Sequence, residues 1–207
     1  LENRQYQNHL EEMVASQVAE MTRMQDEVIT GIANLIESRD GSTGLHVKNT
    51  QNYVQILTKA LREKGMYPDI LDHNYELNTV KASVLHDIGK IKTPDAILLK
   101  PGRLTDEEFE VMKQHTVAGC EIIDRIIGNV EHEEYVDIAR KIARYHHERW
   151  DGTGYPDGLS GEEIPLCARI MALADVFDAL YQDRCYKKAI RPASKVFEII
   201  KENSGSQ

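Results

Sequence analysis

HHERWDGTGYPDG, residues 146–158, sets two adjacent histidines directly before a stretch rich in glycine, proline and aspartate. Glycine and proline are the residues that most often interrupt helices and form tight turns. The sequence therefore predicts that a helix ends near Arg149 and continues as a tight loop. Because the histidines lie where the helix meets the loop, we expect their side chains to carry chemistry there.

The sequence around this loop has the periodicity of helices and almost no alternation typical of strands. Thr105 and Glu108 form a capping-box pattern that opens one helix, and Gly89 is expected to end another. The segment 93–103 is expected to be a loop with at most one helical turn. We predict an all-α fold, a multi-helix bundle with helices at about 10–35, 46–63, 77–89, 105–127, 133–147, 164–181 and 193–203.

Length and composition limit the class of protein. A chain of 207 residues with 41% apolar and 29% charged residues fits one substantial globular domain. Its formal charge of −9 argues against a DNA- or RNA-polymer binder, because phosphate neutralisation needs a basic surface. We find neither a long apolar run nor a signal peptide, and three cysteines without CxxC spacing favour reduced thiols. We expect a cytoplasmic protein without a membrane segment in this sequence.

The N-terminal residues have a different pattern from the rest of the chain. A 4-3 spacing joins Leu10, Val14, Gln17, Met21, Met24, Val28, Gly31 and Leu35 into a mostly apolar seam on one long helix. We predict a connector helix over residues 1–30 and a second unit over residues 31–207. The seam favours a homodimer through this helix, and packing on the chain's own domain is an equally good interpretation, since Gln17 and Gly31 interrupt the seam.

Five histidines and two aspartates stand out from the remaining polar residues. Asp87 follows an apolar stretch and Asp175 lies in the most hydrophobic predicted helix, where an ionised carboxylate is costly unless it is paired or bound to metal. The candidate ligands are His46, His86, Asp87, His115, His146, His147 and Asp175. A mixed histidine and aspartate set favours iron, manganese or zinc. Seven donors exceed one tetrahedral ion, so we predict two ions bridged by Asp87, whose shared hydroxide would attack a phosphoester.

Three motifs carry a family resemblance. HDIGKI, HTVAGCEI and HHERWDGTGYP together resemble the HD-GYP family of HD-domain phosphohydrolases, over roughly residues 30–203. The resemblance implies a metal-dependent phosphodiesterase that hydrolyses cyclic di-GMP, a bacterial second messenger. It also implies that the seven candidate residues hold two transition-metal ions, iron or manganese, with Asp87 between them.

The resemblance assigns roles to further residues. Asp87 and Lys90 would be catalytic, with Lys90 also contacting the scissile phosphate or positioning the attacking water. Arg184 and Lys187 match phosphate-binding cations of the family, and Tyr155 would line the substrate pocket. Glu148 and Asp151 are expected to brace the ligands, while Gly152 and Gly154 permit the turn.

One departure from the family pattern concerns the number of ions. Some members have a glutamate four residues before the first ligand histidine that helps to hold a third ion, and Ser42 occupies that position here. This favours a two-ion site and the linear product pGpG over GMP. Two alternatives remain open: another cyclic dinucleotide such as 3′,3′-cyclic GMP-AMP as substrate, or a low-turnover signalling module that binds a diguanylate cyclase partner.

Overall fold

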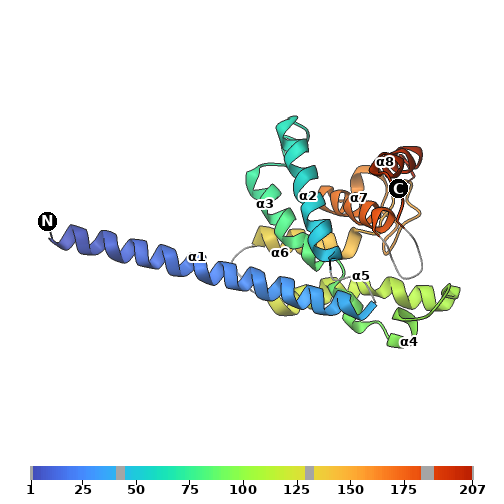
Figure 1. Cartoon of the computed structure of the whole chain (residues 1–207), viewed down its shortest axis with the longest axis horizontal. Coiled ribbons are helices and arrows are strands. Elements are labelled where there is room, and N and C mark those ends of the chain that lie inside the picture. The colour runs from blue at the N-terminus through green and yellow to red at the C-terminus, as the bar shows by residue number, and fades with distance from the viewer. Residues whose placement is uncertain (1, 41–44, 129–132, 183–188, 207) are drawn as a thin grey trace.

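The fold is all-α in the part of the chain that the structure describes. The computed structural model describes residues 2–40, 45–128, 133–182 and 189–206, and within them it contains helices and a single isolated β-bridge, between Asp151 and Ser160. Figure 1 shows one long helix, α1, that projects from a body of packed helices and carries the N-terminus at its far end. The predicted fold class is confirmed.

Helix α1 spans Glu2–Glu37 without interruption, and the 3-10 turn η1 follows at Ser38–Asp40. Its seam is exposed: Leu10 is 44%, Val28 56% and Leu35 70% accessible. Only the last third of α1 packs on the body, through Ile29, Ala33 and Ile36. The helix thus crosses the boundary predicted at residue 30, which stays a prediction.

The body is built from five helices that surround one apolar core. They are α2 (His46–Glu63), α3 (His73–Ala82), α5 (Asp106–Ile127), α6 (Glu133–Tyr145) and α7 (Leu166–Tyr181). Helix α5 packs on α6, α2 lies against α3 and α7, and α6 also packs against α3 and α7. Their shared core includes Val54, Ile123, Ile142 and Met171, all nearly inaccessible to solvent. The bounds of α2 agree with the prediction, and the predicted capping box of Thr105 and Glu108 begins α5.

Two predicted helices end earlier than expected. Helix α3 ends at Ala82, and the chain continues through two 3-10 turns, η2 (Ser83–Leu85) and η3 (Ile88–Lys92). Gly89 therefore lies inside η3 and does not terminate a helix. Helix α6 ends at Tyr145, so His146 and His147 stand in the turn that follows it.

The remaining elements are short. Helix α4 (Asp95–Leu98) is the single turn expected in segment 93–103, η4 covers Gly161–Glu163, and α8 (Ala193–Glu202) packs on α7. None of the described helices combines the length and apolar character needed to cross a membrane.

Candidate metal centre

The seven candidate ligands come from five places in the chain and meet inside the body. His46 begins α2, His86 and Asp87 lie between η2 and η3, His115 is on α5, His146 and His147 follow α6, and Asp175 is on α7. Their donor atoms form two groups, each within 4.8 Å: Asp87, His115, His146 and His147 in one, and His46, His86 and Asp175 in the other. The structure thus brings together all seven residues that the sequence selected.

Asp87 faces both groups with different oxygens. Its Oδ1 lies 3.3 Å from Nε2 of His115 and 3.7 Å from Nε2 of His146. Its Oδ2 lies 3.2 Å from Nε2 of His86. This is the placement that a carboxylate needs in order to serve two neighbouring ions.

The histidine rings are oriented by the backbone so that Nε2 points inward. Nδ1 of His86 donates to the carbonyl of Ser83 at 2.9 Å, and Nδ1 of His115 donates to that of Met112 at 2.7 Å. Nδ1 of His146 is likewise 2.9 Å from the carbonyl of Ile142. A proton held on Nδ1 leaves the Nε2 lone pair available for a metal.

Two inward-facing atoms lack hydrogen-bond partners. Among the described residues of the two donor groups, Nε2 of His86 and Oδ1 of Asp87 are buried without a hydrogen bond, although atoms of neighbouring donor residues lie 3.2–3.7 Å away. Leaving such polar atoms unpaired in the interior is costly. Two ions, one in each donor group, would bind these atoms, so the donor set fits the group that the sequence predicts.

A buried carboxylate holds the remaining histidine. Oδ2 of Asp178, on α7, lies 2.7 Å from Nδ1 of His46, and both side chains are buried. This contact fixes the ring so that Nε2 of His46 lies 3.5 Å from Asp175. Sequence inspection missed Asp178, although it follows Asp175 by three residues and therefore lies near it on one helix face.

Burial and neighbouring charges set the protonation of this cluster. Desolvation would lower the pKa of His86, but the carboxylate of Asp87 outweighs it and raises that pKa to about 9. Desolvation lowers the pKa of His115 to about 4 and that of His147 well below its usual value. Although burial opposes ionisation of Asp87, Lys90 and His86 hold its pKa well below the ordinary value. Once a metal displaces the proton of His86, an ionised carboxylate beside neutral imidazoles is a suitable set for a transition metal.

Glu37 is a donor that the sequence analysis missed. It lies at the last residue of α1, is only 4% exposed, and forms a third group with His46 and Asp87. Ser42 lies outside the described residues, so the expected two-ion site stays a prediction. Glu37 nevertheless provides a carboxylate on this side of the site, from nine positions before His46. Glu37 follows Ile36 and lies four residues after Ala33, so it falls on the apolar face of the helix. A carboxylate on that face is the signal that could have indicated it.

Lys90 lies at the edge of the cluster. Its Nζ is 2.8 Å from Oδ2 of Asp87 and 3.4 Å from Oε2 of Glu37. Within η1, the guanidinium of Arg39 donates to the carbonyls of Lys90 and Ile91. The end of α1 is therefore bound to the segment that carries Asp87.

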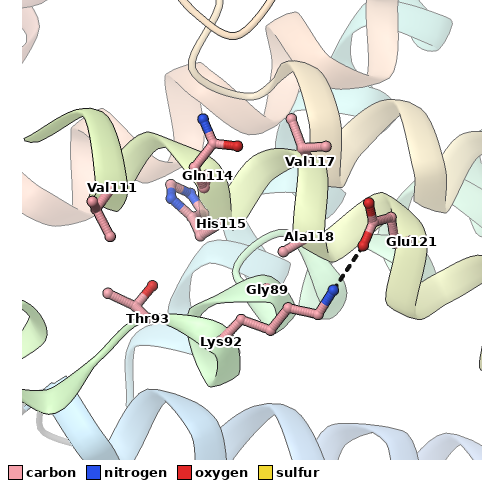
Figure 2. Close-up of a pocket in the computed structure, with 9 residues that line it drawn as sticks. All are labelled: Gly89, Lys92, Thr93, Val111, Gln114, His115, Val117, Ala118 and Glu121. Atoms are coloured by element: carbon pink, nitrogen blue, oxygen red, sulfur yellow. Dashed lines mark hydrogen bonds and ion pairs between the residues drawn. The ribbon is translucent and has the colours of Figure 1, made fainter.

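Gly89 allows this segment to lie directly against α5. A Cβ at Gly89 would be 1.8 Å from the carbonyl oxygen of His115 and 2.5 Å from the nitrogen of Gly119. Figure 2 shows Gly89 beside α5, with an ion pair between Lys92 and Glu121 joining the same two segments at 2.7 Å. A cavity of about 230 Å³ remains between them. Close packing at Gly89 thus explains how Asp87 comes within reach of His115.

The loop after His147 is held by Glu148 in a way that differs from the prediction. The Glu148 carboxylate accepts hydrogen bonds from the backbone N–H groups of Asp157, Gly158 and Leu159 at 2.8–3.1 Å. It therefore braces the loop and not the ligands. Asp151 is exposed and accepts bonds from Thr153, so it stabilises a local turn.

Tyr155 lies against the histidines, as its predicted role in the pocket requires. Its ring centroid is 4.8 Å from that of His147. It lines a cavity of about 470 Å³ between the loop, α7 and α8, with Trp150 and Leu173 among the other lining residues. Gly152 has a φ of +78°, and Gly154 would place a Cβ 2.3 Å from the nitrogen of Arg149, so both are needed for this loop. The predicted phosphate-binding residues Arg184 and Lys187 lie outside the described residues.

A comparison with known protein families identifies the family of this chain. The family model described as HD domain matches residues 8–207. The chain belongs to the HD domain family. This membership agrees with the all-α body and with the way that His86 and Asp87 meet further histidines. The resemblance to HD-GYP proteins is confirmed.

Relatives of this HD domain protein carry names of one enzyme class. It is 46% identical over 189 residues to a protein of Vibrio cholerae named cyclic di-GMP phosphodiesterase, covering 90% of the chain and 38% of the relative. A Thermotoga maritima protein of the same name is 41% identical, covering 86% of the chain and 45% of the relative. A Vibrio cholerae protein named 3′3′-cGAMP-specific phosphodiesterase 2 is 39% identical, and the match covers 78% of the chain and 28% of the relative. The chain spans less than half the length of these relatives.

Proposed function

We propose that this HD domain protein is a metal-dependent phosphodiesterase that opens cyclic di-GMP to linear pGpG in the cytoplasm. The observation that supports it is the position of Asp87, whose two oxygens face separate groups of metal donors. The names of the relatives support the choice of a cyclic dinucleotide as substrate.

The donor groups suggest how two transition-metal ions, iron or manganese, would be held. Asp87, His115, His146 and His147 would hold one, and His46, His86 and Asp175 the other, with Asp87 shared. When bound, such ions supply a nucleophile at neutral pH and neutralise charge on the phosphate. The Glu37 carboxylate adds a donor at the His46 side, and a third ion held there would favour GMP over pGpG as the final product.

The chain's own residues would position the phosphodiester. In the reaction, water oxygen adds to phosphorus and the P–O3′ bond breaks, which leaves a 5′-phosphate and a 3′-hydroxyl. Lys90 lies 2.8 Å from Asp87 and is therefore placed to meet a phosphate oxygen as negative charge develops. Arg184 and Lys187 would bind phosphate, as the family resemblance implies.

The cavity beside Tyr155 is a suitable place for one base. Its volume of about 470 Å³ and its apolar lining by Trp150, Leu173 and Val176 are typical of small-ligand pockets. Because His146 and His147 line the same cavity, a base bound there would bring the adjoining phosphate to the donor groups.

Product analysis tests the proposal. Protein purified without oxygen and loaded with Mn²⁺ or Fe²⁺ is incubated with cyclic di-GMP, beside Asp87→Ala and, as a control, Asp137→Ala, which changes an exposed carboxylate on α6. We expect pGpG from the wild type and the control, and none from Asp87→Ala. Cleavage of 3′,3′-cyclic GMP-AMP alone would support the alternative substrate. No product from metal-loaded protein with either nucleotide would support a binding module for a diguanylate cyclase partner.

The exposed seam of α1 supports a homodimer as part of this proposal. Its apolar residues repeat at the 4-3 spacing of coiled coils, and Val14, Met21 and Met24 are each more than half exposed. A second copy of α1 in parallel register would cover them. We expect Met24→Cys to form an intermolecular disulfide and Met24→Glu with Val28→Glu to shift the protein to monomer in light scattering, whereas an unchanged mass would contradict the homodimer.

A further inference from the structure

Lys113, on helix α5 two residues before His115, lies over two aromatic rings, one from α5 and one from the loop that follows His147. Its Nζ is 5.0 Å from the ring centroid of Phe109 and 5.6 Å from that of Tyr155. The two rings meet edge to face, with centroids 6.0 Å apart and an interplanar angle of 84°. We call Phe109, Lys113 and Tyr155 the α5 ledge.

The ledge adjoins the metal donors through Tyr155. The Tyr155 ring lies 4.8 Å from His147 and 6.4 Å from His115, measured between centroids. Tyr155 thus belongs both to the ledge and to the lining of the 470 Å³ cavity.

The ledge has features that stability alone does not explain. Phe109 is 42% exposed, so it contributes little to the core. The charged partner of Lys113 is Glu110 at 2.6 Å, whose side chain is 65% exposed, and such surface pairs add little stability. A phosphate can replace this exposed carboxylate as the partner of Lys113 without uncovering any buried charge.

A cyclic dinucleotide needs a second binding position of this kind. It has two phosphates and two bases, and only one phosphate can occupy the metal centre at a time. The other phosphate needs its own cation, which is important on a chain with a net charge of −9. An exposed aromatic ring provides a surface on which a purine can stack.

From these contacts we infer that the α5 ledge binds the half of the dinucleotide that is not being cleaved, with Phe109 stacked on its base and Lys113 paired with its phosphate. This assignment rests on the proposed function. It makes Lys113 and Phe109 substrate-binding residues, which act on recognition of the second nucleotide and not on the metals.

The test compares two substrates in the metal-loaded chain. Cyclic di-GMP offers a second phosphate and a second base, whereas bis(p-nitrophenyl) phosphate offers neither. For Lys113→Met and Phe109→Ala we expect the KM for cyclic di-GMP to rise, and its kcat/KM relative to that of the small diester to fall at least about fivefold. Lys113→Arg, which keeps the cation, should retain most of the wild-type ratio. Lys141→Met and Phe197→Ala, at somewhat more exposed positions on α6 and α8, serve as controls and should keep it.

The outcomes separate the two claims. If the wild type hydrolyses cyclic di-GMP and both ledge variants keep its ratio of kcat/KM values for the two substrates, the proposed function stands but the role of the ledge in substrate binding is contradicted. A parallel loss on both substrates would also overturn it, because the residues would then act through the metal centre. A wild type that cleaves only the small diester would overturn the proposed function, and the ledge with it. Circular dichroism melting curves show that each variant compared is folded.

Discussion

Oδ2 of Asp178 lies 2.7 Å from Nδ1 of His46, and the two side chains are buried together at the start of α2. Such a contact fixes the tautomer of a ligand histidine and increases its basicity. For Asp178→Asn we expect the affinity for metal to fall about 10–100-fold. Competition with a chelator measures it, and Asp137→Asn, on the exposed face of α6, is the matched control. An affinity equal to that of the wild type would contradict the positioning role.

Gly89 is predicted to be indispensable for a steric reason. In Gly89→Ala the new Cβ would lie 1.8 Å from the carbonyl oxygen of His115, so η3 and α5 must separate. We expect a loss of about 3 kcal/mol or more in the free energy of unfolding, together with loss of bound metal. Gly31→Ala on α1 meets no atom within 4 Å and should stabilise the helix by up to about 1 kcal/mol. Urea titration of both variants checks the contrast, which equal stabilities would refute.

Metal binding is predicted to release a proton at neutral pH. The pKa of His86 is raised to about 9 without metal, so its Nε2 must lose a proton when a metal binds. The metal affinity should therefore increase about tenfold per pH unit from pH 7 and level off near the pKa of about 9. The stability of the metal-free protein should change with pH in the opposite direction. Protonated His86 contributes to the free energy of unfolding in full below its ordinary pKa of 6.5, and this contribution is lost as the pH rises through about 9.

Calorimetry in two buffers of different ionisation enthalpy measures this proton. The apparent binding enthalpies in the two buffers should differ by the difference in buffer ionisation enthalpy for one released proton. Equal heats, with an affinity that does not change from pH 7 to 9, would show that His86 does not bind the metal in this way.

Glu37 is predicted to contribute to metal binding, although it lies on α1, most of which projects from the body (Figure 1). Its carboxylate lies 3.9 Å from Nε2 of His46 and belongs to a donor group with Asp87. In Glu37→Gln we expect the metal content after dialysis to fall, with the affinity of the weakest ion lowered at least about tenfold. Glu27→Gln, on the exposed part of the same helix, is the control. Wild-type metal content in both variants would exclude Glu37 as a donor.

Local sequence patterns predicted the fold class and most helices well. The capping box at Thr105 and the apolar periodicity of α2 are local signals, and the structure agrees with both. The seven donor residues could also be selected, because aspartates such as Asp175 stand out in apolar segments and need a reason to be there. The family resemblance gave the same seven residues.

Features that depend on packing between distant segments could not be read in this way. Gly89 was expected to end a helix, but its function depends on how closely η3 approaches α5. The histidine contact of Asp178 and the inward position of Glu37 depend on how α7 and α1 are placed against the body. Glu148 was expected near the ligands, whereas its partners are N–H groups that only the folded loop brings together.

The central claim is that the donors around Asp87 bind metal ions that are required to cleave a cyclic dinucleotide. The most direct measurement is a titration of metal-free protein with Mn²⁺ under anaerobic conditions while the loss of cyclic di-GMP is followed by chromatography. We predict no hydrolysis before metal is added, turnover that rises as the sites fill, and none at any Mn²⁺ concentration in Asp87→Asn. Hydrolysis by the metal-free protein, or full metal occupancy with no hydrolysis, would contradict the account.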